Sequence, residues 1–300
     1  MMKHIGALLF GIALLSGCSP DPSPDKPPAT HTGTQEFPNW PALLNDFRFH
    51  WTAAPGIDIT TGPAVAIRAY IESYEVATMT SDINNVYPGF LRATPENQPT
   101  DEGPYQSELT DIRPLGIYQR STPPTAVPHF GYNTDHILEL TEIPQGFRAI
   151  ICSGSYANFI KSSVNADSYI SASARETQAG VEPHNDSPYV GISVRQVELT
   201  QSDPRVAADA PAPPQGPQKG PAPAPQVDVF GNWFITASSS VGWGPITRPV
   251  LDNFPTPEIE KRCSDSMPHN EAQRREMMTG HKDQPPPHGD AVPGWPLRSE

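Results

Sequence analysis

The sequence is short of positive charge, of cysteine and of long apolar runs. It has 20 Lys and Arg residues against 33 Asp and Glu, a net charge of −13. Nucleic acids and anionic lipid surfaces are bound through clustered cations, so this balance argues against both as partners. No apolar run reaches the roughly 18 residues of a transmembrane helix. Only three cysteines are present, so each has to be assigned individually.

The one notable apolar run ends in a cysteine, at the start of the chain. Lys3 and His4 precede apolar residues from Ile5 to Leu15, and the stretch closes on Leu14-Leu15-Ser16-Gly17-Cys18. About eleven residues span roughly 16 Å as a helix, half a bilayer core. The layout therefore predicts a cleaved export signal. The cysteine at its end favours a lipoprotein signal, and the alternative is an ordinary secretory signal with an incidental cysteine.

The Leu14–Cys18 stretch resembles the signals of bacterial prolipoproteins, in which the cysteine thiol is diacylated and the preceding peptide bond is cut. The resemblance implies a signal peptide over 1–17 and lipidation of Cys18, with palmitate among the expected acyl groups. It also implies a mature protein held by lipid on the extracytoplasmic face of a cell membrane or envelope. Because Lys3 leaves with the signal, the mature chain would carry a net charge of −14.

The two cysteines left after Cys18 form an even pair in an oxidising compartment, which predicts a Cys152–Cys263 disulfide. Such a bridge closes a loop of about 110 residues, and the chain-entropy estimate is about 4–5 kcal/mol. Two buried free thiols, or one reactive nucleophile, are the alternatives.

Most of the 38 prolines fall in three tracts that divide the chain. Residues 18–35 are predicted to be a lipidated, extended tether. Residues 36–281 are predicted to form a single α+β domain, interrupted by a proline-rich surface excursion at 204–226. A linker between two domains is the other interpretation of that tract. Residues 282–300 are predicted to be a flexible tail, ordered only where Trp295 finds a pocket.

The clearest helix is predicted over 63–78, with Pro63 at the first position and apolar residues at three- and four-residue spacing. It is expected to be the main amphipathic helix, packed on an antiparallel sheet, although the same stripe could line a ligand pocket. Short helices are expected from Thr256 to Cys263 and, with a capping box of Asn270 and Gln273, from 270 to 279.

Strands are suggested by β-branched and aromatic residues between turn signals. The segments 136–143 and 147–152 should form a hairpin around Pro144-Gln145-Gly146. Apolar residues change face along 189–200, which suggests a bulge near Arg195-Gln196. The strands are expected at 109–120, 136–143, 147–152, 189–200 and 228–238.

No motif for chemistry stands out. The stretch Cys152-Ser153-Gly154-Ser155 lacks the glycine spacing around a serine that a nucleophile elbow has. Asp135-His136 with His129, and His184 with Asp186, could each supply two metal ligands, whereas zinc needs three or four. The pairs Glu139 with Glu142 and Glu258 with Glu260 are expected by chance in so acidic a chain. We therefore assign no catalytic residue, no metal and no cofactor.

Several segments resemble uncharacterised mycobacterial-type cell-envelope lipoproteins, a likeness that covers most of the mature chain and implies location without an activity. The order of one helix followed by strands also resembles the nuclear-transport-factor-2-like fold, whose sheet curls round a helix to make a conical pocket. The segments that carry the first likeness are GPAVAIRAYIESYEVA (62–77), VYPGF (86–90), HILELTEIPQGFRAIICSGSY (136–156), VFGNWFITASSSVGWGPI (229–246) and RCSDSMP (262–268).

Two functions remain open on the sequence. The leading hypothesis is a non-enzymatic envelope lipoprotein that binds another envelope component or supports its assembly. The alternative is a small-ligand-binding or enzymatic domain with a pocket between the 63–78 helix and the sheet. A cavity with convergent polar groups beneath that helix would favour the alternative.

Overall fold

The computed structural model of the chain describes residues 37–100, 104–114, 125–206, 210–246 and 254–297. By their internal contacts, the residues divide into Met1–Gln35 and Glu36–Glu300, and the described residues all belong to the second unit. The expected signal peptide, Cys18 and the 18–35 tether lie outside the described residues. Along the part of the chain that is described, no helix is long and apolar enough to cross a membrane.

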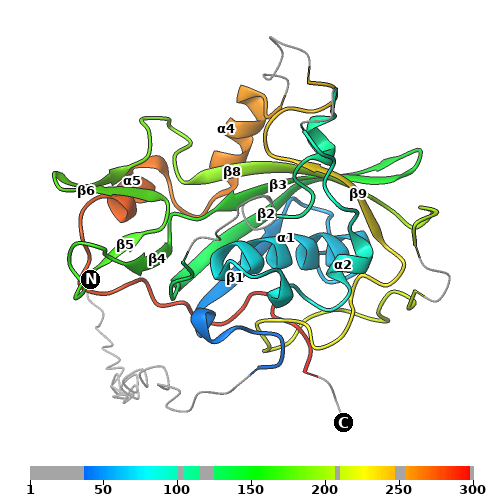
Figure 1. Cartoon of the computed structure of the whole chain (residues 1–300), viewed down its shortest axis with the longest axis horizontal. Helices are drawn as coiled ribbons and strands as arrows, with labels where there is room; N and C mark the ends of the chain where they lie inside the picture. Colours follow the sequence, from blue (N-terminus) through cyan, green and yellow to red (C-terminus); the bar gives the residue numbers. More distant parts are fainter. Residues whose placement is uncertain (1–36, 101–103, 115–124, 207–209, 247–253, 298–300) are drawn as a thin grey trace, which may run out of the picture. The chain divides into compact units, whose positions relative to one another are not determined.

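The Glu36–Glu300 unit is a mixed α/β domain with a curled, mainly antiparallel sheet and few helices (Figure 1). The larger sheet has the order β5-β4-β2-β3-β8-β9, with β1 paired to β2 in parallel, while β6 and β7 form a separate ribbon. The strands are β1 (Asp46–Ala53), β2 (Phe130–Ile143), β3 (Gly146–Gly154), β4 (Asn158–Lys161), β5 (Tyr169–Ser171), β6 (Ala174–Thr177), β7 (Gly180–Pro183), β8 (Ile192–Thr200) and β9 (Phe234–Ser239). The α-helices are α1 (Pro63–Thr80), α2 (Phe90–Ala93), α4 (Pro257–Ser266) and α5 (Glu271–Met278), and the 3-10 turns are η1 (Ala42–Leu44), η2 (Ile83–Asn85) and η3 (Ser107–Leu109).

The helix predicted over 63–78 is confirmed as α1, which begins at Pro63 and ends before Ser81 in the left-handed region. Its buried surface extends beyond the apolar stripe that the spacing predicts. Arg68 and Glu72 are 0% and 1% exposed, as deeply buried as the apolar side chains around them. Side chains of α1 share one apolar core with strand residues and with later segments of the chain. A helix covered on all sides buries its charged residues too, so these have to be paired inside the protein.

The expected hairpin is confirmed: β2 and β3 pair in antiparallel, with Ile143 opposite Gly146. The expected bulge is not at Arg195-Gln196, where β8 pairs with β3 without interruption, but the register of β8 against β9 does shift between Glu198 and Leu199. The apolar residues of β8 change face because both faces are buried. Val197 and Leu199 belong to the core that contains α1, whereas Val190 and Val194 belong to a second core beside α4.

Two further strand predictions need correction. The strand expected at 109–120 is absent over its described part, 109–114, which is a short 3-10 turn followed by bends. Conversely, β1 forms in a segment where no strand is predicted. Its Phe47, Phe49 and Trp51 alternate into the core, and β1 gains its hydrogen bonds from β2, about 80 residues further along the chain.

The proline-rich excursion and the tail contact each other and are partly inside the protein. Ala222 and Trp295 exchange backbone hydrogen bonds, and both are fully buried. A Cβ on Gly294 would lie 2.2 Å from the carbonyl oxygen of Gly220, so the close approach requires glycine there. The expected flexible tail is therefore attached to the domain through backbone hydrogen bonds at Lys282, Val292, Gly294 and Trp295, and Val292 is bonded to β1 (Figure 1, red).

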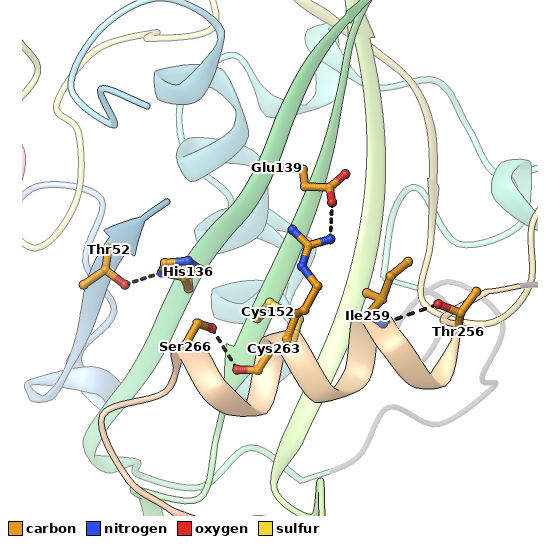
Figure 2. Close-up of a disulfide and its surroundings, with 9 residues drawn as sticks. Thr52, His136, Glu139, Cys152, Thr256, Ile259, Cys263 and Ser266 are labelled. Carbon is orange, nitrogen blue, oxygen red and sulfur yellow. Dashed lines mark hydrogen bonds and ion pairs between the residues drawn. A yellow bond between two sulfur atoms is a disulfide. The ribbon is translucent and has the colours of Figure 1, made fainter. Parts of the chain in front are cut away.

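The short C-terminal helices form as their caps predict. The Thr256 hydroxyl accepts a hydrogen bond from the Ile259 N–H at the start of α4, and Asn270 with Gln273 forms a capping box at the start of α5. Cys152 of β3 and Cys263 of α4 are joined by the predicted disulfide, with a Cα–Cα distance of 5.3 Å (Figure 2). The bridge ties α4 to the face of the sheet opposite α1.

Candidate functional site

The predicted disulfide cysteines are not candidates for catalysis. Cys152 and Cys263 are both fully buried and bonded to each other, so neither offers a thiolate. Lipidation of Cys18 stays a prediction, because that residue lies outside the described part of the chain.

The histidine pairs considered as metal ligands do not converge. Asp135 and His136 are neighbours on β2, so their side chains lie on opposite faces of the sheet. The His136 imidazole pairs with the Thr52 hydroxyl at 2.7 Å (Figure 2), and the His129 imidazole pairs with the Asn158 amide oxygen. Within the described ranges, no group of three His, Cys, Asp or Glu side chains could hold a metal ion.

One fully buried polar group is the Glu72 cluster, formed by Glu72, Arg68, Trp51, Tyr87 and Trp295. The Glu72 carboxylate accepts hydrogen bonds from the indole N–H of Trp51 at 2.8 Å, the Tyr87 hydroxyl at 2.9 Å and the indole N–H of Trp295 at 2.7 Å. The Arg68 guanidinium stacks on the Trp295 ring at 4.2 Å, with its Nε 4.0 Å from the carboxylate. Burial raises the pKa of Glu72 to about 7, against the opposing effects of Arg68 and the three donors.

The Glu72 carboxylate is fully occupied by the protein itself. Arg68 also donates to the carbonyls of Ile59, Gln218 and Pro293, which belong to three separate loops. A carboxylate with three donors and a neighbouring guanidinium has little capacity left for a ligand. We conclude that this cluster holds the tail and the excursion on α1.

A second polar group on the α1 side of the sheet is not satisfied. The Asp135 site consists of Asp135 and Asn133 on β2, Ser153 opposite Asp135 on β3, and Glu75 on α1. Asp135 is 0% exposed, and neither of its carboxylate oxygens has a hydrogen-bond partner in the described structure. The amide oxygen of Asn133, two residues away on the same face, is likewise buried without a donor.

The charges around Asp135 are negative. Burial raises the pKa of Asp135 well above its ordinary value, and the nearby carboxylates of Glu75 and Glu72 raise it further, while the Ser153 hydroxyl opposes the shift. Burial also raises the pKa of Glu75, which the Arg195 guanidinium opposes. Arg195 is engaged elsewhere, through an ion pair with Asp111 at 3.3 Å. Burial and the two neighbouring carboxylates therefore favour the neutral, protonated form of Asp135.

A buried polar atom without a partner costs about 1–3 kcal/mol, more if it is charged. Native proteins retain few such atoms, and those that remain commonly serve a water, a ligand or a catalytic step. The Asp135 site gathers three such oxygens next to Glu75, which keeps part of its surface exposed. The arrangement can accept hydrogen bonds from a donor-rich ligand, or hold and release a proton.

Sequence reasoning considered Asp135 only as a metal ligand beside a histidine. The alternation of β2 would have placed Asn133, Asp135 and Ile137 on one buried face, where an acid is unusual. The relation of this face to Glu72 and Glu75 of α1 had no local signal, because strand and helix are about 60 residues apart.

The isosteric change Asp135→Asn should stabilise the protein at alkaline pH. An Asp with a raised folded-state pKa contributes its stability below the unfolded value, near 4, and loses it as pH rises through the folded value. The free energy of unfolding of Asp135→Asn should therefore exceed that of the wild type by about 1–3 kcal/mol at pH 8 and match it near pH 4. Urea unfolding measured at both pH values checks this difference.

The matched control is Glu142→Gln, which removes an exposed acid from the same strand and should leave both curves unchanged. A variant Asp135→Asn that is less stable than the wild type at both pH values would mean that the carboxyl group has a structural partner, contrary to the geometry.

Comparison with protein-family models, with curated proteins and with solved structures finds no match to this chain, so its function has to be argued from the Asp135 site itself.

Proposed function

We propose that this is an exported, lipid-anchored envelope protein whose folded domain binds a small polar ligand at the Asp135 site. The observation that carries the proposal is the fully buried Asp135 carboxyl group without a hydrogen-bond partner. The anchor and the envelope location rest on the Leu14–Cys18 stretch and on the resemblance to envelope lipoproteins. The role of docking an envelope partner or supporting its assembly, which the tether suggests, stays a prediction.

The position of the site favours ligand binding over a structural role. In the Glu72 cluster, a buried carboxylate with a structural role accepts hydrogen bonds from three donors. Asp135 lies on the same side of the sheet, and the Ser153 hydroxyl is close enough to lower its pKa but does not form a hydrogen bond of normal geometry with either carboxylate oxygen. Sites kept at a cost in stability are those where function requires them.

We also propose that the domain uses the arrangement of the nuclear-transport-factor-2-like fold, with the sheet curled round α1. The shared core of α1 with β1, β2, β3, β8 and β9 supports this arrangement. In that fold the space between helix and sheet is where a ligand would enter. The resemblance concerns architecture and assigns no reaction.

A screen of small polar compounds tests the binding function. Ligand-observed NMR on the full mature chain in detergent should find compounds whose binding is lost in Asp135→Asn and kept in Glu142→Gln. If every compound that binds the wild type binds Asp135→Asn equally well, the Asp135 site is not a ligand site.

The change Cys18→Ala tests the anchor. Because the acyl chains are the expected attachment, the variant protein should leave the membrane fraction and appear in the soluble fraction. Fractionation followed by immunoblotting measures this, with Cys18→Ala compared with Ser19→Ala, a neighbour that carries no acyl group. Unchanged membrane retention of Cys18→Ala would remove the basis for a lipid anchor.

A further inference from the structure

The unpartnered atoms of the Asp135 site are all of one chemical kind. They are the two carboxylate oxygens of Asp135 and the amide oxygen of Asn133, and each can only accept a hydrogen bond once the carboxyl group is ionised. They belong to residues two positions apart on β2, whose side chains share one face of the sheet. A ligand that completes this site therefore brings several donors and needs no acceptor.

The acidic side chains around Asp135 favour a ligand that carries a positive charge. Glu72 and Glu75 of α1 both act on Asp135, so the site has acidic neighbours. The two cations of the same core are committed. Arg68 is bonded to three backbone carbonyls and stacked on Trp295, and Arg195 is paired with Asp111 and Ser238.

We propose that the Asp135 site accepts an organic ammonium group, an inference that rests on the proposed small-ligand function. A primary ammonium carries three N–H donors and one positive charge, which matches three free oxygens beside acidic side chains. An alcohol brings a single donor and would leave two of these oxygens without a partner. The described residues offer no set of three ligating side chains for a metal ion.

The neighbouring strand adds aromatic surface suited to such a ligand. In the parallel register of β1 and β2, Phe49 lies beside Asn133 and Trp51 lies beside Asp135. Aromatic rings attract cations and pack against the carbon atoms that an alkylammonium carries. The ligand class is therefore an amine with a short apolar or polar stem.

Binding should be linked to loss of a proton. The groups that face Asp135 are Glu72 and Glu75 from α1, Trp51 from β1 and Ser153 from β3. Tyr156, which belongs to the core beside α4, also interacts with it electrostatically. None of these described side chains is a cation, and burial with the two glutamates raises the pKa of Asp135, which favours its protonated form. An arriving ammonium displaces that proton into solvent, and the affinity should rise with pH until the amine itself deprotonates near pH 10.

Isothermal titration calorimetry on the full mature chain in detergent tests the proposal, with n-butylammonium as the probe. The matched probes are n-butanol, which has the same stem without the charge, and tetramethylammonium, which has the charge without N–H donors. We expect n-butylammonium to bind at least about tenfold more tightly than either. Titrations in two buffers of different ionisation enthalpy should detect a released proton.

Variants connect this binding to the site. Asp135→Asn should weaken n-butylammonium binding at least about tenfold and abolish proton release, whereas Glu142→Gln should change neither. Glu75→Gln is a second variant that keeps the test valid if Asp135→Asn fails to fold, and it should weaken binding several-fold by removing one neighbouring negative charge.

The outcomes separate the ammonium inference from the proposed function. Equal binding of n-butanol and n-butylammonium, lost in Asp135→Asn, would overturn the ammonium inference and leave the ligand site standing. Binding of n-butylammonium that neither Asp135→Asn nor Glu75→Gln weakens would overturn it too. If no amine binds, and the compound screen finds no ligand that depends on Asp135, both proposals fall together.

Discussion

Replacing Trp295 by alanine should lower the free energy of unfolding by about 3–5 kcal/mol, the range for deleting a buried Trp or Phe side chain. Trp295 is 1% exposed although it stands only five residues from the end of a chain of 300. Its loss leaves a cavity, removes one donor from the Glu72 carboxylate and uncovers the Arg68 guanidinium. Urea or thermal unfolding of the full mature chain in detergent measures the change.

Two controls identify which part of Trp295 matters. Trp295→Phe keeps much of the ring and loses the indole N–H, so it should cost about 1–3 kcal/mol by leaving Glu72 short of a donor. Leu297→Ala alters a largely exposed residue two positions further on and should cost less than about 0.5 kcal/mol. If Trp295→Ala unfolds with the same free energy as the wild type, the tail does not contribute to the core.

The double change Cys152→Ala, Cys263→Ala should cost about 2–5 kcal/mol. The bridge joins residues 111 positions apart, so its removal frees a long loop in the unfolded chain. Both cysteines belong to the smaller core between the sheet and α4, and α4 itself has only Cys263 fully buried. Without the bridge, α4 depends on the Arg262–Glu139 ion pair and on a few apolar contacts (Figure 2).

Unfolding curves of the wild type, expressed under oxidising conditions, and of the double variant measure this effect, with the wild type also measured after reduction. Mass spectrometry under non-reducing conditions gives the control, since the bridged protein should show no alkylatable thiol at either position. Two alkylatable thiols in the exported protein, or equal stability with and without the cysteines, would rule out a stabilising bridge.

The features predicted well from the sequence are those with a local cause. The α1 helix follows from apolar spacing over a single segment, and the Thr256 and Asn270 caps depend on side chains that reach only three residues ahead. The β2–β3 hairpin likewise needs only a turn between two adjacent strands. The disulfide was predicted by counting, because the expected lipidation of Cys18 would leave two cysteines to pair.

The features that were missed depend on distant segments. β1 is completed by β2, which follows it by more than 75 residues, and a short strand without its partner has no pattern of its own. The change of face along β8 suggested a bulge because the sequence does not reveal that two cores lie on either side of the sheet. The tail appeared free because its partner, Ala222, lies in a tract that also looked like surface.

The candidate site shows the same division. Asp135 could be noticed in the sequence, but its neighbours Glu72 and Glu75 come from a helix about 60 residues earlier, and its lack of donors is a property of the packed core. The pairing of Glu72 with Trp51, Tyr87 and Trp295 spans sequence separations of 21, 15 and 223 residues. Neither fact can be derived from residue spacing.

The sequence by itself determined the helix α1, the β2–β3 hairpin, the two helix caps and the Cys152–Cys263 pairing. The first three depend on propensities and spacings within a few residues, and the disulfide depends on the number of cysteines. The tertiary structure alone decided that the tail and the excursion join the core, and that Glu72 is satisfied while Asp135 is not. These outcomes depend on which distant segments come into contact when the chain folds. Those contacts decide which side chains are buried and which find a hydrogen-bond partner, so a buried acid such as Glu72 is satisfied while Asp135 is not.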